Sequence, residues 1–202
     1  MKRLMLVRHG ESEWNASRRL QGQADIALSD RGRSQARALQ PTIAALRPER
    51  VVASSLKRAR DTATLLGFPD AELDDGLREI DVGEWAGENI DALIARDPQA
   101  YKAWRAGRHT PPGGEAWASF TARTGNVVRT LLDAEHGDIL VVSHGGVLRA
   151  LLERLLALSP EKIVPVGPGS LTMLQHDPNG RNELRLELFN FSPNGPLLDA
   201  PD

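Results

Sequence analysis

Two histidines follow two similar apolar runs that lie far apart in the chain. Residues 4–7 lead to His9 and a glycine, and residues 139–142 lead to His144 and two glycines. Short apolar runs that end in glycine are typical of buried strands. In an open α/β sheet, ligands bind outside the carboxyl ends of the parallel strands. We therefore expect both imidazoles in one catalytic site at this edge of the sheet.

The groups beside these histidines favour an anionic ligand. Gly145 and Gly146 open a predicted helix, whose unpaired N–H groups and dipole attract anions. Arg8 ends the first strand, and Arg58 lies in the first turn of the helix that follows the second. Guanidinium groups match the oxygens of a phosphate in bidentate fashion. A phosphoryl group is the predicted ligand.

Two imidazoles can carry out phosphoryl transfer without a metal or any other cofactor. One neutral ring attacks phosphorus while the other, charged, stabilises the transition state. A divalent cation would add charge to a pocket that is already positive, which disfavours a zinc site. The leaving alkoxide needs a proton, and Glu79 and Asp81 are both candidate donors. Periodicity does not choose between these two carboxyl groups.

The elements that position these residues alternate in the βαβ manner, which favours a largely parallel sheet with helices on both faces. Ser29 caps a helix that Pro41 is expected to kink or interrupt. Ser54 or Ser55 is expected to cap the helix that carries Arg58. The other predicted elements are strands at 50–53, 138–142, 170–175 and 184–191, helices at 33–39, 56–66, 115–135 and 147–158, and a turn at Asn179-Gly180.

Length and composition are those of an ordinary globular protein with one domain over residues 1–202. The chain has 41% hydrophobic residues and a net charge of −2, which argues against a nucleic-acid or anionic-membrane partner. It has no cysteine, which excludes disulfides and thiolate nucleophiles. The first apolar run is too short for a signal peptide or a membrane span, so we expect a cytoplasmic protein. The C-terminal hairpin offers an edge strand for a homodimer, and residues 192–202 are expected to form a flexible tail.

Residues 84–114 form short polar pieces that contain tryptophan, and we interpret them as a lid insertion. Asp97 and Pro98 are typical of a helix start. Large aromatic side chains beside cations can hold a sugar, an aromatic group or an acidic organic phosphate. They can also simply pack the lid onto the sheet, and both interpretations stay open. The residues concerned are Trp85, Tyr101, Trp104, Arg105, Arg108, His109 and Trp117.

The decapeptide from Leu6 to Asn15 resembles the signature of the histidine phosphatase superfamily, the phosphoglycerate mutase-like proteins. Further blocks in family order are Gln21-Gly22, residues 28–32, 54–59, 77–79, 112–115 and 143–146. The resemblance implies a three-layer α/β/α fold. It implies His9 as the phosphorylated nucleophile, Glu79 rather than Asp81 as the proton donor, Arg8, Arg58 and His144 as the rest of the phosphate pocket, and Asn15, Gln21, Gly22 and the Gly145 amide as further contacts.

The resemblance implies a phosphatase that hydrolyses a small-molecule phosphomonoester through phosphohistidine, with no cofactor. The alternatives are a cofactor-dependent phosphoglycerate mutase and a non-catalytic phospholigand-binding protein on the same fold. Mutases tend to be longer and to have Gly-Trp where this chain has Gly22-Gln23, which favours the phosphatase branch. Phosphoglycerate-derived, sugar, nucleoside and cobalamin-precursor phosphates all remain candidate substrates. Ala116 departs from the serine that relatives often have there.

Overall fold

A six-stranded sheet forms the centre of the computed structural model, which describes residues 2–135, 137–176 and 184–195. The strands are β1 (Lys2–Arg8), β2 (Arg50–Ser54), β3 (Glu72–Asp74), β4 (Ile139–Ser143), β5 (Leu171–His176) and β6 (Leu184–Phe191), in the order β3-β2-β4-β1-β5-β6. The pairs β3-β2, β2-β4 and β4-β1 are parallel, whereas β5 is antiparallel to both β1 and β6. The prediction of a largely parallel sheet is confirmed. Strand β3 was not predicted from the sequence, because its three residues are exposed or half-buried and show no hydrophobic period.

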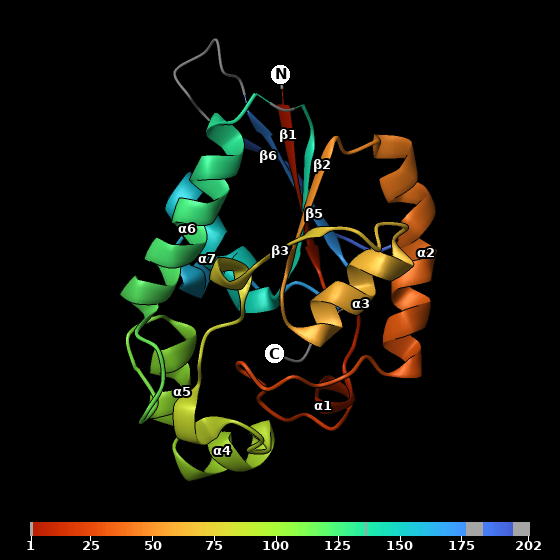
Figure 1. The fold of residues 1–202 in the computed structure, drawn as a ribbon. Coiled ribbons are helices and arrows are strands. Elements are labelled where there is room, and N and C mark those ends of the chain that lie inside the picture. The colour runs from red at the N-terminus through yellow and green to blue at the C-terminus, as the bar shows by residue number, and fades with distance from the viewer. Residues whose placement is uncertain (1, 136, 177–183, 196–202) are drawn as a thin grey trace.

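Helices cover both faces of the sheet and complete three layers (Figure 1). On one face lie α2 (Asp30–Leu46) and α3 (Lys57–Leu65), and on the other lie α6 (Trp117–Asp133) and α7 (Gly145–Leu156). Alternate residues of β1 enter the two cores, since side chains of a strand point to opposite faces. Leu4 and Leu6 belong to the core under α6 and α7, and Met5 and Val7 to the core under α2 and α3. The predicted α/β/α architecture is confirmed.

Helix α2 runs unbroken through Pro41, so the predicted interruption is wrong. Leu39 and Ile43, on either side of the proline, are fully buried, and their packing offsets the hydrogen bond that proline removes. The predicted cap is confirmed, because Ser29 Oγ accepts a hydrogen bond from the Gly32 N–H at 3.1 Å.

The predicted serine cap of α3 is wrong. Leu56 occupies the cap position, and the Lys57 N–H donates instead to Asp25 Oδ1 at 2.5 Å. Both serines have other partners. Ser54 Oγ lies 2.7 Å from His144 Nε2, and Ser55 Oγ accepts a hydrogen bond from Arg78 Nε at 2.7 Å.

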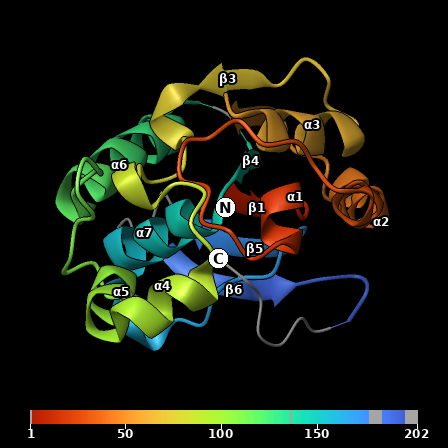
Figure 2. The same ribbon diagram turned by 90° about the horizontal axis from the view of Figure 1, so that it is seen from below.

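The predicted lid segment lies beyond the carboxyl ends of the parallel strands, together with the short helix α1 (Glu13–Ala16) (Figures 1 and 2). It contains α4 (Ile90–Arg96) and α5 (Pro98–Arg105). Asp97 caps α5 by accepting from the Ala100 N–H at 2.8 Å, and Pro98 is the first helical residue, as predicted. Two 3₁₀ turns, Asp75–Leu77 and Gly83–Trp85, precede the lid helices, and a third, Pro160–Lys162, follows α7.

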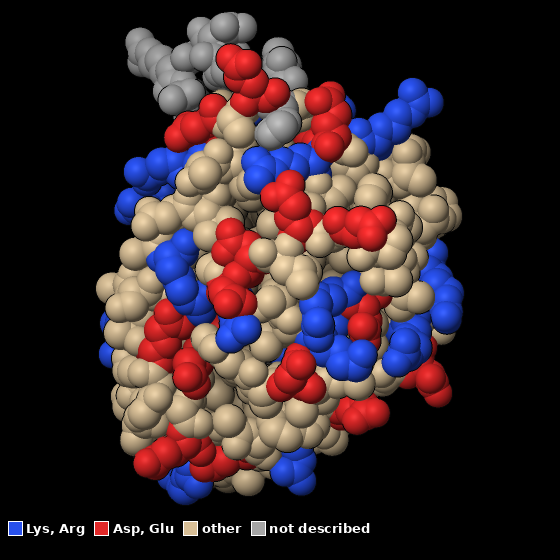
Figure 3. Space-filling view, viewed as in Figure 1, with Lys and Arg blue, Asp and Glu red and all other residues tan. Residues whose placement is uncertain are grey.

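The predicted turn at Asn179-Gly180 lies outside the described residues, as do residues 196–202 of the expected tail. No helix within the described ranges is long and apolar enough to cross a membrane. On the face that Figure 3 shows, acidic and basic side chains are interspersed, with no large block of one sign.

Candidate active site

The ends of β1 and β4 bring the two histidines together. His9 follows β1, and its backbone N–H donates to the carbonyl of Ser143, the last residue of β4, at 2.9 Å. His144 follows directly, and the two imidazole rings meet edge to face with centroids 5.2 Å apart. Both rings are buried. The expected juxtaposition at one sheet edge is therefore confirmed.

The hydrogen bonds of His9 assign its tautomer. His9 Nδ1 lies 2.6 Å from the Gly10 carbonyl, which can only accept, so Nδ1 carries the proton. The lone pair is then on Nε2, where it accepts a hydrogen bond from Arg58 Nε at 3.2 Å. Burial, reinforced by the charges of Arg58 and Arg8, holds the pKa of His9 well below its ordinary value. The ring is therefore neutral, with a nucleophilic nitrogen beside a guanidinium group.

His144 is held from the side of β2. Its Nε2 lies 2.7 Å from Ser54 Oγ, and its buried Nδ1 has no hydrogen-bond partner among the described residues. Burial and the charge of Arg58 are the largest causes that hold the pKa of His144 well below its ordinary value. The direction of this shift favours a neutral His144 ring before a ligand binds, and the charged second imidazole expected during phosphoryl transfer remains a prediction. A bound phosphoryl dianion would favour the charged form of the ring, because an opposite charge stabilises it.

The guanidinium group of Arg58 is fixed by three hydrogen bonds. Besides the bond to His9, it donates to the carbonyls of Ala24 at 2.7 Å and Gly22 at 2.8 Å. Gly22 has a positive φ of 50°, which glycine adopts without strain, and the turn aims its carbonyl at Arg58. Burial lowers the pKa of Arg58 to about 10, so the side chain remains charged at neutral pH.

Arg8, the residue before His9, is also fixed by a backbone carbonyl. Its Nη1 donates to the Val166 carbonyl at 2.5 Å. A β-carbon at position 145 would lie 3.4 Å from the Arg8 guanidinium carbon, so the start of α7 lies against this side chain. Two guanidinium groups and the first turn of a helix therefore surround the nucleophile.

The structure distinguishes the two candidate proton donors. Glu79 lines the pocket, and its Oε2 accepts a hydrogen bond from the Gly146 N–H at 3.0 Å. A β-carbon at position 146 would overlap the Glu79 carboxylate and displace it from this position. Asp81 does not line the pocket, and its Oδ1 accepts from the Gly83 N–H at 2.9 Å in a local turn.

Arg123 of α6 clamps the segment that carries Glu79. Its guanidinium group donates to the backbone carbonyls of Gly76 (2.9 Å), Arg78 (2.8 Å) and Glu79 (3.0 Å). It also makes a bidentate pair with Glu115, with both distances 2.7 Å. The irregular segment before the lid thus receives a fixed position from helix α6.

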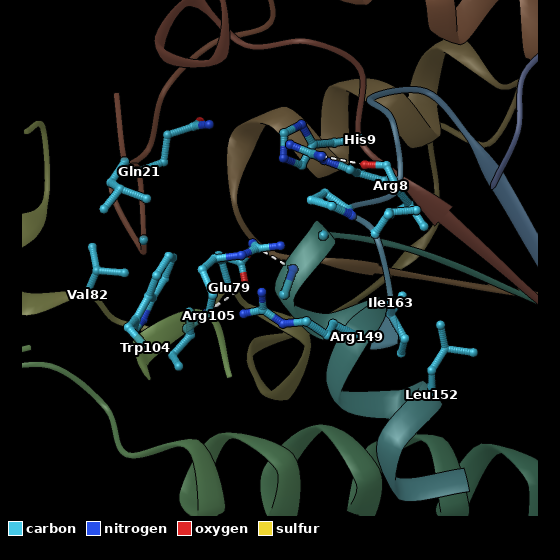
Figure 4. A pocket seen from close by; sticks show the side chains of 18 of the residues that line it. Arg8, His9, Gln21, Glu79, Val82, Trp104, Arg105, Arg149, Leu152 and Ile163 are labelled. Atoms are coloured by element: carbon cyan, nitrogen blue, oxygen red, sulfur yellow. Dashed lines mark hydrogen bonds between the residues drawn. The ribbon is translucent and has the colours of Figure 1, made fainter. Parts of the chain in front are cut away.

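These residues line a pocket with about 670 Å³ of empty space, including solvent at its mouth (Figure 4). His9 and Arg8 lie at one end, Trp104 and Val82 at the other, and Glu79 between them. The full lining is Arg8, His9, Leu20, Gln21, Gly22, Arg58, Glu79, Ile80, Val82, Trp104, Arg105, Gly145, Gly146, Arg149, Leu152, Ile163, Val164, Pro165 and Val166. Gln21, Gly22 and Gly145, the further contacts that the family resemblance implies, are thus among the residues that line this pocket.

Two of the expected site residues do not line the pocket. His144 lies behind His9, against Ser54. Asn15 is buried, and its Oδ1 accepts from the Ser12 N–H at 3.1 Å. The Ser12 hydroxyl lies 3.0 Å from Asn15 Oδ1 and 2.7 Å from Gln21 Oε1, and thereby links Asn15 to the pocket wall.

The sequence-based candidates omit Arg149 and the segment 163–166. Arg149 is four residues beyond Gly145, a spacing that places both on one face of α7 and could have revealed it. Segment 163–166 has no helix or strand period, so no comparable signal marks it. Within the described part of the chain, no group of three or more histidine, cysteine or acidic side chains is arranged to hold a metal.

The chain belongs to the histidine phosphatase superfamily (branch 1), whose family model matches residues 4–188. It is 37% identical over 170 residues to a glucosyl-3-phosphoglycerate phosphatase of Mycolicibacterium vanbaalenii, covering 78% of this chain and 76% of that protein. A probable phosphoglycerate mutase of Erwinia tasmaniensis is 36% identical over 168 residues, with the same two coverages. Among solved structures, a mycobacterial glucosyl-3-phosphoglycerate phosphatase complexed with VO3 superposes with a TM-score of 0.85. Its identity is 33%, covering 94% of this chain and 99% of that one.

Proposed function

We propose that the protein is a metal-independent phosphatase that hydrolyses a small-molecule phosphomonoester through a phosphohistidine on His9. The observation that carries the proposal is the neutral His9 ring. Its Nδ1–H is fixed on the Gly10 carbonyl, and its Nε2 lone pair lies beside Arg58 in an arginine-lined pocket. A lone pair that is not protonated at neutral pH is what attack on phosphorus requires.

In the first step, His9 Nε2 forms a bond to phosphorus as the bond from phosphorus to the leaving oxygen breaks. Glu79, in its acid form, donates a proton to that oxygen. Arg8, Arg58 and the Gly145 amide neutralise charge on the phosphoryl oxygens, which phosphoryl transfer demands above all. The Gly10 carbonyl stabilises the positive ring of the phosphohistidine by accepting from Nδ1–H.

In the second step, water attacks phosphorus and Glu79, now a carboxylate, takes its proton. The bond from phosphorus to nitrogen breaks, its electron pair returns to His9 Nε2, and inorganic phosphate leaves. His144, held behind His9 by Ser54, supports both steps by taking up a positive charge when the phosphoryl dianion binds. Both His9 and Glu79 return to their starting states, so the cycle needs no cofactor.

The test is to follow free phosphate and 2-phosphoglycerate together during incubation with 3-phosphoglycerate, alongside a panel of phosphomonoesters with and without chelator. We expect phosphate release that chelator does not affect. Efficient isomerisation without phosphate release would instead identify a mutase, the alternative that the Erwinia relative keeps open. Activity that chelator abolishes would refute metal independence.

The nucleophile is tested by trapping the phosphoenzyme. His9→Ala is expected to abolish both hydrolysis and the acid-labile phosphoenzyme, whereas His109→Ala, a lid histidine outside the pocket lining, retains both. Full retention of either property in folded His9→Ala would refute the assignment. A protein that forms no phosphoenzyme with any substrate would be a phospholigand-binding module. Cytoplasmic location, a homodimer and the lack of nucleic-acid or membrane partners remain predictions.

A further inference from the structure

The irregular loop between α1 and α2 contacts two parts of the proposed catalytic machinery. The carbonyls of Gly22 and Ala24 accept hydrogen bonds from the Arg58 guanidinium group at 2.8 and 2.7 Å. Between them, the Gln23 side chain donates from Nε2 to the backbone carbonyl of Glu79 at 3.3 Å. Three successive residues of one loop therefore contact the arginine beside the nucleophile and the residue that is the proposed proton donor.

Asp25, the next residue of this loop, attaches the loop to α3. Its Oδ1 accepts a hydrogen bond from the Lys57 N–H at 2.5 Å, and its Oδ2 lies 3.9 Å from Arg60 Nη2. Lys57 and Arg60 lie on either side of Arg58 in the first turn of the helix. The Asp25 carboxylate thus holds the stretch of backbone that bears Arg58, while carbonyls of the preceding loop residues hold the Arg58 side chain.

The start of α3 has no cap from its own segment. Leu56 occupies the cap position and has no side-chain oxygen to accept from an N–H group of the first turn. Asp25 supplies this acceptor from 32 residues away, and its negative charge is favourable at the positive end of the helix dipole. Burial lowers the pKa of Arg58, whereas the charges of Glu79 and Asp25 raise it. The same carboxylate therefore stabilises both the helix start and the charged guanidinium group.

We propose that Asp25 is a positioning residue, which fixes Arg58 against His9 by capping α3 from the loop that holds the Arg58 side chain. Asp25 does not line the pocket, so it acts on the reaction through Arg58. Arg58 Nε lies 3.2 Å from His9 Nε2, and a displaced helix start would shift this contact. Misplacement of a group by about 1 Å can cost roughly 100-fold in rate. The inference rests on the proposed phosphatase function and adds a residue to its machinery.

The test measures hydrolysis of p-nitrophenyl phosphate and, by calorimetry, the Kd of inorganic phosphate. Asp25→Ala removes the acceptor. It is expected to lower kcat/KM by about 3- to 30-fold and to weaken phosphate binding by a similar factor, the range that loss of a helix cap spans. Asp25→Asn keeps an oxygen that accepts from the Lys57 N–H, so it should recover most of the loss. Asn89→Ala is the matched control and should leave both measurements unchanged, because Asn89 Oδ1 caps α4 by accepting from the Ala92 N–H at 3.0 Å, and α4 does not line the pocket.

A double-mutant cycle separates positioning of Arg58 from a general effect on stability. In an Arg58→Ala background, Asp25→Ala has no guanidinium group left to misplace, so its effect on phosphate binding should fall below about twofold. An Asp25→Ala effect of the same size in both backgrounds would overturn the proposal, since Asp25 would then act without Arg58. Failure of Asp25→Asn to recover the loss would overturn it as well. If Asp25→Ala does not fold, Asp25→Leu, which has the shape of aspartate without an acceptor, replaces it in the cycle.

Phosphate binding distinguishes failure of this inference from failure of the proposed function, because binding requires no turnover. If wild-type protein hydrolyses p-nitrophenyl phosphate and Asp25→Ala matches it in both kcat/KM and phosphate Kd, the positioning role is refuted and the phosphatase function stands. If wild-type protein binds phosphate but hydrolyses no phosphomonoester and forms no phosphoenzyme, the proposed function fails. The phosphate Kd values of the cycle then decide the role of Asp25 by themselves. If wild-type protein binds no phosphate and hydrolyses no phosphomonoester, both fail.

Discussion

The two ends of the pocket are built in different ways. At the phosphate end, His9, Arg8 and Arg58 are held by backbone carbonyls of the loop residues 10, 22, 24 and 166. At the leaving-group end, lid helix α5 supplies Trp104 and Arg105 to the wall. The first end is rigid and sets the chemistry. The second end consists of lid side chains, which are separate from the residues that hold the nucleophile.

The rigidity of the phosphate end comes from hydrogen bonds that the sheet supplies. The Gly169 N–H lies 3.1 Å from the carbonyl oxygen of Arg8 and 2.9 Å from that of His9, and so connects the end of β1 to the start of β5. The Gly10 N–H donates to Thr62 Oγ1 of α3 at 3.1 Å. Donors fixed in this way need no rearrangement as charge develops on phosphorus, which is the main source of catalytic stabilisation.

The largest effect in the comparison is expected at Glu79, where the two ends meet. Glu79→Gln cannot donate a proton, so kcat for alkyl phosphates should fall by about 10²- to 10⁴-fold. The loss should be far smaller for p-nitrophenyl phosphate, because nitrophenolate leaves without a proton. Steady-state and burst kinetics with both substrates measure the difference.

Asp81→Asn is the control for Glu79, since Asp81 is the neighbouring carboxylate that turns away from the pocket. It should change neither substrate's kcat appreciably. If Asp81→Asn showed the leaving-group dependence and Glu79→Gln did not, the proton donor would be misassigned.

A smaller effect of the same kind is expected when Arg123, which holds the segment that carries Glu79, is replaced. Arg123→Lys cannot donate to three carbonyls and the Glu115 carboxylate at once, so the Glu79 carboxyl group loses its position. We expect a loss of about 10- to 100-fold in kcat for alkyl phosphates, with most of the activity on p-nitrophenyl phosphate retained. Glu115→Gln tests the same set of contacts with a smaller change of side chain, because it removes only the charge that pairs with Arg123.

Arg129→Lys is the matched control for Arg123, because Arg129 is exposed on the same helix. A merely structural role for Arg123 would lower activity on both substrates equally, together with the fraction of folded protein. That outcome would remove Arg123 from the list of positioning residues.

The phosphate end was predictable from sequence because its signals are local. Apolar runs that end in His9 and His144, each before glycine, identify the strand ends directly, and the sheet rule then brings them together. Arg58 follows in the same way from a strand-to-helix junction. Choosing Glu79 over Asp81 requires more, because both lie in an irregular segment whose geometry depends on Arg123, 44 residues away from Glu79.

The leaving-group end was not predictable in the same way. Trp104 and Trp85 pack edge to face with ring centres 5.9 Å apart. This is a tertiary contact, and the hydrophobic period of the sequence does not indicate it. The guanidinium group of Arg149 lies over the rings of Trp104 and Trp117, and these are contacts between distant parts of the chain. The α3 cap shows the same limit, because Asp25 reaches it from a distant loop while Ser54 is engaged by His144.

The smallest expected effect concerns stability, and it follows from the buried neutral histidines at the phosphate end. The unfolded chain binds a proton on each ring near pH 6.5, whereas His9 and His144 have pKa values well below this in the folded protein. Acidification below pH 6.5 therefore favours the unfolded state, by about 1.4 kcal/mol per pH unit for each ring. Above this pH both states hold neutral rings, and the two histidines contribute no pH dependence.

Urea unfolding between pH 5.5 and 7.5 measures this slope. His144→Gln should reduce the pH dependence of the unfolding free energy by the contribution of about one proton. Saturating inorganic phosphate should also reduce this pH dependence, because the anion favours ring protonation in the folded state. If the wild-type slope were unchanged by both, His144 would bind protons equally in the folded and unfolded states. Burial would then not lower the pKa of His144, and its ring would be protonated at the same pH in both states.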